Sequence, residues 1–303
     1  MENAGIFFKN RSYSSCVHEG LKLGIQNFLT LLRNVWPTML VASLVTAAAS
    51  LTIGKFLPYL VSFIGKADST LMLFGIFMLL KLVMLLAGSI YLGHLFLLIR
   101  KYHELQFFPI LSLKETWPEL KGLWGRSFSW LLVFWVISFG SFAIFHYTAG
   151  WTWWSFLFDL IILLVFSIPY LFSGVACLFD QTNLKGTWKA YLQAFHTWGG
   201  TAAVTLVGGL VALIILFISW LPSCILLAAE VFSYQNMLAG DPIDLPSGFA
   251  ILKFFVLFFT VVLSGIAMWA LVFPLVFHYA SVKFRTEEKE NMIKENSLDD
   301  YTE

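Results

Sequence analysis

The chain has 303 residues, of which 59% are hydrophobic and only 12% are charged. A soluble domain is about 45–50% apolar and about 25% charged, so a soluble globular enzyme is excluded. The net charge of +1 leaves no basic field of the kind that nucleic-acid binding requires. We therefore expect an integral membrane protein that does not bind nucleic acid.

Six apolar stretches are long enough to cross a bilayer, for which about 20 residues are needed. They are 35–57, 71–99, 128–147, 153–179, 201–220 and 249–280. A seventh apolar segment, 221–234, follows the fifth stretch and includes Pro222. It is too short to cross alone, and two interpretations stay open: a kinked extension of the fifth span or a re-entrant segment. The sequence predicts an all-α bundle of six transmembrane helices.

The Lys and Arg residues between these stretches predict the orientation. Fifteen lie on one side, whereas the other side holds only Lys55, Lys66 and Lys253. Because cytoplasmic loops carry an excess of Lys and Arg, we expect both termini in the cytoplasm. The expected location is the bacterial inner (plasma) membrane. The loops on the opposite side, 65–70, 148–152 and 235–247, are too short to form an external domain.

A helical pattern precedes each pair of spans, with four apolar residues at steps of +4, +3 and +4 on one helix face. The three sets are Leu21, Ile25, Phe28 and Leu32; Leu113, Trp117, Leu120 and Trp124; and Leu184, Trp188, Tyr191 and Phe195. In each set a lysine follows the first leucine: Lys22, Lys114 and Lys185. The spacing predicts three amphipathic cytoplasmic juxtamembrane helices and a threefold internal repeat, with units of about 15–99, 107–179 and 182–281.

These helices have two possible uses. They hold membrane lipids or another membrane protein at the inner leaflet, through Lys22, Lys114, Trp117, Lys185 and Trp188. Alternatively, they pack beneath the bundle and bind nothing. The repeats make one membrane domain, 1–285, and we expect the charged tail, 286–303, to be disordered.

Three stretches within this span plan carry a resemblance to a known family. They are Gly20-Leu21-Lys22 through Phe28, Leu184-Lys185-Gly186-Thr187-Trp188, and Phe277-His278-Tyr279-Ala280 before the charged tail. Over residues 15–285 the chain resembles the six-helix membrane domain attached to some glycerophosphodiester phosphodiesterases, and related stand-alone bacterial inner-membrane proteins. The catalytic domain of the fused members has no counterpart here, so the resemblance implies architecture and no activity.

Ionisable residues inside spans are the first candidates for function, because the membrane makes them costly. Lys81 and Asp159 lie at depths that differ by roughly 6 Å at 1.5 Å per residue, a gap that a lysine side chain covers. We expect an ion pair between the second and fourth spans. It serves as a packing device or lines a substrate or proton path, unless each side chain reaches the interface alone. Glu230 lines a polar path or is a solvated interfacial carboxylate.

Catalytic and metal-binding patterns are missing from the sequence. It contains no GxxxxGK[ST], HExxH, GxSxG or GxGxxG motif. His94, His146 and His278 lack metal-ligand spacing and are expected as polar caps at the interfaces. We therefore expect no cofactor, no metal and no enzyme. The favoured function is lipid binding or assistance to a membrane complex through the inner-leaflet helices. The alternative is a small transporter or channel with a polar route near Lys81 and Asp159.

Overall fold

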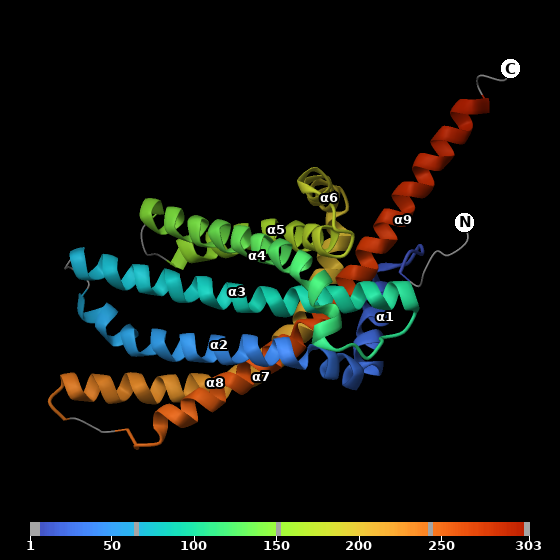
Figure 1. Cartoon of the computed structure of the whole chain (residues 1–303). Coiled ribbons are helices and arrows are strands. Elements are labelled where there is room, and N and C mark those ends of the chain that lie inside the picture. Colours follow the sequence, from blue (N-terminus) through green and yellow to red (C-terminus); the bar gives the residue numbers. More distant parts are fainter. Residues whose placement is uncertain (1–6, 64–66, 150–152, 242–244, 300–303) are drawn as a thin grey trace.

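A computed structural model describes residues 7–63, 67–149, 153–241 and 245–299, and these residues form nine helices (Figure 1). The helices are α1 (Tyr13–Gln26), α2 (Phe28–Phe63), α3 (Ala67–Leu105), α4 (Leu113–Ala149), α5 (Trp153–Leu178), α6 (Leu184–His196), α7 (Trp198–Leu238), α8 (Phe249–Ala267) and α9 (Trp269–Asp299). Six helical stretches among them are long and apolar enough to cross a membrane. The prediction of an all-helical, multi-pass membrane protein is confirmed at this level.

The long helices form three hairpins, α2–α3, α4–α5 and α7–α8, and the C-terminal ends of α2, α4 and α7 lie at one end of the bundle (Figure 1). Neighbouring hairpins pack through α8 against α2 and through α3 against α4. The short helices α1 and α6 and the last part of α9 lie at the opposite end. Apolar side chains cover the outward faces of α5 and α7, as hydrocarbon surroundings require.

The most deeply buried part of the molecule is the first half of α9. Every residue from 272 to 282 is buried, so this stretch has no exposed face. Helices α1, α5, α7 and α8 pack around it. Two glycines allow this close approach. An ideal Cβ at Gly20 of α1 would lie 2.5 Å from the Pro274 nitrogen, and one at Gly208 of α7 would lie 2.7 Å from the Ala270 carbonyl oxygen.

The sixth predicted span, 249–280, is divided between two helices. The helix is interrupted at Met268, which lies between the end of α8 and the start of α9. Pro274 has no N–H to donate to the Ala270 carbonyl, one turn earlier, which weakens the helix just after this break. Gly208 brings its backbone against that same carbonyl oxygen. Part of the expected continuous span is therefore replaced by a bend at which α7 and α9 cross.

Segment 221–234 is an extension of the fifth span, because α7 continues through Pro222 as one helix. The re-entrant interpretation is wrong. Side-chain hydroxyls supply hydrogen bonds around this proline. Thr260 of α8 donates to the Ser219 carbonyl at 3.1 Å, and its hydroxyl lies 2.9 Å from that of Ser223. Such local bonds allow a proline inside a membrane helix.

The three segments before the hairpins differ from one another. The third forms the separate helix α6, whereas the second is the beginning of the continuous helix α4. The first pattern crosses the break at Asn27 between α1 and α2. This break lies 6 residues after Leu21, but the matching break at Thr197 lies 13 residues after Leu184. The leucine–lysine pairs thus occupy different positions in their helices, and the threefold repeat is not confirmed.

The tail also differs from its prediction. Residues 286–299, expected to be disordered, continue α9 as a helix that extends beyond the bundle (Figure 1). Most of these residues are charged or polar, and side chains 287–293 are exposed. Because extending an existing helix requires no new nucleus, α9 continues past the bundle surface.

Neighbouring glycines of α7 test the importance of the α7–α9 crossing. We expect Gly208→Ala to lower the free energy of unfolding by about 1–3 kcal/mol, because its methyl group would overlap the Ala270 carbonyl. Gly209→Ala is the matched control, since nothing lies within 4 Å of an ideal Cβ there. Thermal unfolding in one detergent compares the two. Equal stability of both variants would show that the crossing is not tightly packed.

Candidate functional site

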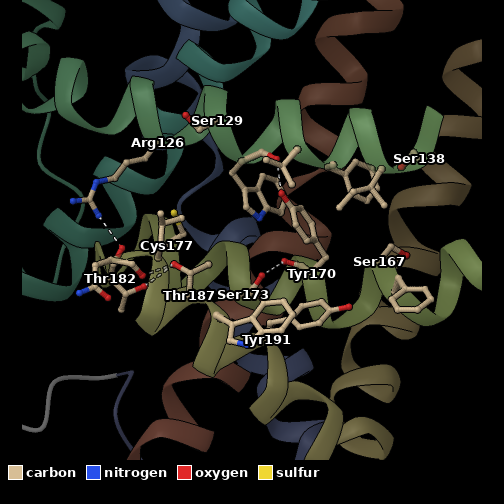
Figure 2. A pocket seen from close by; sticks show the side chains of 18 of the residues that line it. Arg126, Ser129, Ser138, Ser167, Tyr170, Ser173, Cys177, Thr182, Thr187 and Tyr191 are labelled. Atoms are coloured by element: carbon tan, nitrogen blue, oxygen red, sulfur yellow. Dashed lines mark hydrogen bonds between the residues drawn. The ribbon is translucent and has the colours of Figure 1, made fainter. Parts of the chain in front are cut away.

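A groove of 630 Å³ between α4, α5 and α6 is the candidate site (Figure 2). Its volume lies within the range of about 300–1,000 Å³ that is usual for small-molecule sites. Its lining is mostly apolar, with a few hydroxyl groups and one guanidinium group. On α4 the lining extends from Gly125 to Ser138, which corresponds to about 20 Å at 1.5 Å rise per residue. The groove therefore suits a long apolar molecule with one polar end.

Aromatic rings form the middle of the groove. The Trp130 and Tyr170 rings stack with centroids 5.0 Å apart, and Phe134 stacks on Tyr170 at 5.5 Å. The Tyr170 hydroxyl donates to the Trp130 carbonyl at 2.6 Å, which ties α5 to α4. Gly174 makes room for the indole, since an ideal Cβ there would lie 2.5 Å from the Trp130 ring. These contacts give the groove a preformed aromatic wall.

The polar end of the groove lies where α5 turns into α6. Arg126 of α4 donates from Nη1 to the Thr182 carbonyl at 3.2 Å (Figure 2). No salt bridge among the described residues involves this guanidinium group. Asn183 caps α6 by accepting from Gly186 N at 2.9 Å, which sets where α6 begins. Arg126 therefore brings a positive charge to this end without a carboxylate partner.

The α6 side of the groove is partly aromatic. Trp188 and Tyr191 of α6 line it and stack with centroids 5.3 Å apart. The Tyr191 phenol is neutral at physiological pH, and burial raises its pKa further above the ordinary value. It adds a hydroxyl group and no charge to the site.

The five predicted inner-leaflet residues are not brought together. Trp188 lines the groove, and Lys185 directly follows the lining residue Leu184. Lys22 lies on α1, whereas Lys114 and Trp117 lie in the first turns of α4, and none of the three lines the groove. One of the three predicted segments thus contributes to the candidate site.

The structure does not join Lys81 and Asp159. Lys81 Nζ lies 5.6 Å from the centroid of the Phe77 ring on its own helix, and no salt bridge between described residues links it to Asp159. Asp159 is buried, and within the described part of the chain its Oδ1 has no hydrogen-bond partner. The reason is the helix order: α3 packs on α4, and α4 packs on α5. Matching depth did not bring the two residues together.

Glu230 forms an ion pair, but its partner is Lys253 rather than solvent. The Lys253 side chain is 8% exposed and that of Glu230 is 23% exposed. The pair joins α7 to α8, and Gly54 of α2 faces it, because an ideal Cβ there would lie 2.9 Å from Lys253 Nζ. The interpretation of Glu230 as a solvated carboxylate is therefore wrong. Its neighbourhood is a junction of three helices.

Two of the histidines lie inside the bundle instead of capping its interfaces. His94 Nδ1 lies 3.0 Å from the Thr38 hydroxyl, and His278 Nε2 lies 3.1 Å from the Thr201 hydroxyl. Both histidines are buried, and each contact joins neighbouring helices. The His146 side chain is outside the described residues. Within the described part, no group of three His, Cys, Asp or Glu residues is arranged to hold a metal.

Sequence reasoning missed Arg126, Trp130, Tyr170 and Lys253 as functional candidates. In the sequence, Arg126 and Lys253 contribute only to the distribution of Lys and Arg that predicts the orientation, Arg126 as one of the fifteen on the cytoplasmic side. A signal was present: each lies inside or at the edge of an apolar stretch, where a charge is costly. Trp130 and Tyr170 carried no such signal, because aromatic residues are frequent throughout this chain.

No known protein family, curated protein or solved structure matches the chain. The resemblance to the membrane domain of some glycerophosphodiester phosphodiesterases therefore stays a prediction.

A double-mutant cycle tests the Glu230–Lys253 pair. Removing one partner from a buried pair costs about 3–5 kcal/mol, and partial exposure of Glu230 reduces our expectation for Lys253→Met to about 1–3 kcal/mol. The double variant with Glu230→Gln should lose less stability than the sum of the single losses, because neither charge then remains buried alone. Unfolding of the four proteins in detergent measures the coupling.

Lys81→Met and Asp159→Asn form the matched control cycle. We expect their effects to add, since the structure does not join the two residues. Coupling in this cycle, or additivity at Glu230 and Lys253, would contradict the helix arrangement described above.

Proposed function

We propose that this protein is a non-enzymatic membrane protein that binds membrane lipid, with an acyl chain held in the groove between α4, α5 and α6. The observation that carries the proposal is a long apolar groove with an aromatic wall and a single cationic end. A lipid has the same division, with an apolar chain and a polar headgroup. The absence of catalytic motifs in the sequence agrees with a binding role.

The length of the groove supports an acyl chain as occupant. The hydrocarbon core of a bilayer is about 30 Å thick, so one leaflet contributes roughly 15 Å. The lining of about 20 Å along α4 is long enough for one such chain together with the start of a headgroup. The excess of positive charge on the α1 and α6 side favours that side as cytoplasmic. We therefore propose that the groove lies in the inner leaflet of a bacterial inner membrane.

Exposed apolar residues of α6 support an interfacial position for this helix. The Leu184 side chain is 91% exposed and that of Trp188 is 61% exposed, although both also line the groove. Apolar groups of this size are costly in water, whereas lipid or another membrane protein would cover them. Assistance to a membrane complex through α6 is consistent with lipid binding at the same place.

The transporter or channel alternative has less support. Its expected polar route needed Lys81 and Asp159 together, and these residues lie on helices separated by α4. Glu230 and Lys253, which also lie on membrane-spanning helices, neutralise each other. Asp159 alone, with its unpartnered Oδ1, is the remaining observation in favour of a route.

Two valines of α4 provide a matched test of lipid binding. Val133 lines the groove, whereas Val136, three residues later and similarly exposed, does not. We expect Val133→Trp to fill the groove and to reduce severalfold the crosslinking of a phospholipid with a photoreactive acyl chain to peptides of α4 and α5. Mass spectrometry of the digested protein identifies and quantifies these crosslinks.

Val136→Trp adds the same bulk to the outer face of α4 and should leave the groove crosslinks unchanged. If the two variants give equal yields, the acyl chain does not occupy the groove. If the wild-type protein forms no crosslinks along the groove, the proposed function is wrong.

A further inference from the structure

We infer that the occupant of the groove is a net-anionic glycerophospholipid whose phosphate binds Arg126 while one acyl chain lies along the Trp130–Tyr170 wall. The inference rests on the proposed function and names the class of lipid. It joins two observations: an apolar groove, and a guanidinium group without a carboxylate partner at one end of it.

Arg126 has unused binding capacity at the groove. A guanidinium group has five N–H donors in a planar fork, and the structure gives Arg126 one hydrogen bond, to the Thr182 carbonyl. That bond orients the side chain along the turn between α5 and α6 (Figure 2). The remaining donors suit the geometry of a phosphate group, which arginine binds through two parallel hydrogen bonds.

The surroundings of Arg126 are positive. Helix α6 begins next to it, at Leu184, so the positive end of the α6 dipole adds to the guanidinium charge. Lys185 and Lys189 are exposed on the same helix, although neither lines the groove. The acidic residue of the preceding turn, Asp180, is neutralised by Lys283 at 2.6 Å and also accepts from the Tyr279 hydroxyl at 2.7 Å.

The excess of positive over negative charge around Arg126 distinguishes between classes of lipid headgroup. Every glycerophospholipid has a phosphate, but a zwitterionic headgroup also brings an ammonium group. That ammonium would lie beside the Arg126 guanidinium, and the acidic residue of the turn, Asp180, is already paired with Lys283. A lipid without the second charge avoids this repulsion, so the site favours a net-anionic headgroup.

Competition between two lipids tests the inference. The full-length protein is placed in nanodiscs of equal parts phosphatidylglycerol and phosphatidylethanolamine, each in turn carrying the photoreactive acyl chain. We expect wild type to crosslink phosphatidylglycerol preferentially within the groove. Arg126→Gln should reduce that preference roughly tenfold, as for the loss of one charge-assisted contact. Arg126→Lys should keep most of it, because the charge remains.

Arg33→Gln is the matched control. Arg33 is an exposed arginine near the start of α2, outside the groove, and its removal changes the net charge by the same amount. We expect this variant to keep the wild-type preference. If Arg33→Gln and Arg126→Gln reduce the preference equally, a general surface charge attracts the lipid and the specific site is overturned.

The remaining outcomes separate this inference from the proposed function. An unchanged preference in Arg126→Gln, with groove crosslinks that Val133→Trp still removes, overturns the headgroup site but leaves lipid binding intact. If Arg126→Gln does not fold, phosphatidylglycerol with a photoreactive headgroup is used on the wild-type protein. Crosslinks to residues 178–184 support the site, and crosslinks elsewhere overturn it. No groove crosslinks with either lipid would mean that the proposed function itself fails.

Discussion

The architecture depends on the close packing of α9 between its neighbours. Residues 272–282 are buried on all sides, so four other helices must approach this stretch of backbone. Gly20 and Gly208 make that approach possible, since a methyl group at either position would overlap the backbone near Pro274 or Ala270. In a bilayer, where lipid tails are as apolar as side chains, such small-residue contacts are a main source of helix association.

The α4–α5 hairpin is attached to this centre mainly at one end, and the groove follows from that attachment. α5 packs against α6, α7 and α9 as well as α4. The extensive contacts of α4, by contrast, are with its sequence neighbours α3 and α5. The short turn into α6 folds that helix back across the hairpin, and Arg126 fastens the turn by its bond to Thr182. The space enclosed between the three helices is the groove (Figure 2).

Local patterns predicted the spans because hydrocarbon imposes a strong requirement on each segment separately. Apolar length alone located six stretches. The predicted bounds differ from the observed helix ends where a proline or a helix cap interrupts a helix, as at Met268 and Asn27. The repeat was harder to judge. Four apolar positions and a lysine recur at helical spacing, but the helix breaks at Asn27 and Thr197 fall at different distances from Leu21 and Leu184. Apolar periodicity is too common in such a chain to determine register.

The sequence by itself determined the helical class, the membrane environment and the number of spans, because each follows from the free energy of transferring one segment into hydrocarbon. Only the tertiary structure decided which charges meet. Lys81 and Asp159 match in depth yet lie on helices separated by α4, whereas Glu230 pairs with Lys253. The groove beside Arg126 could not be predicted from the sequence either, because three helices line it. Depth in the membrane is encoded along the chain, but the neighbour of a helix is set by packing against all the others.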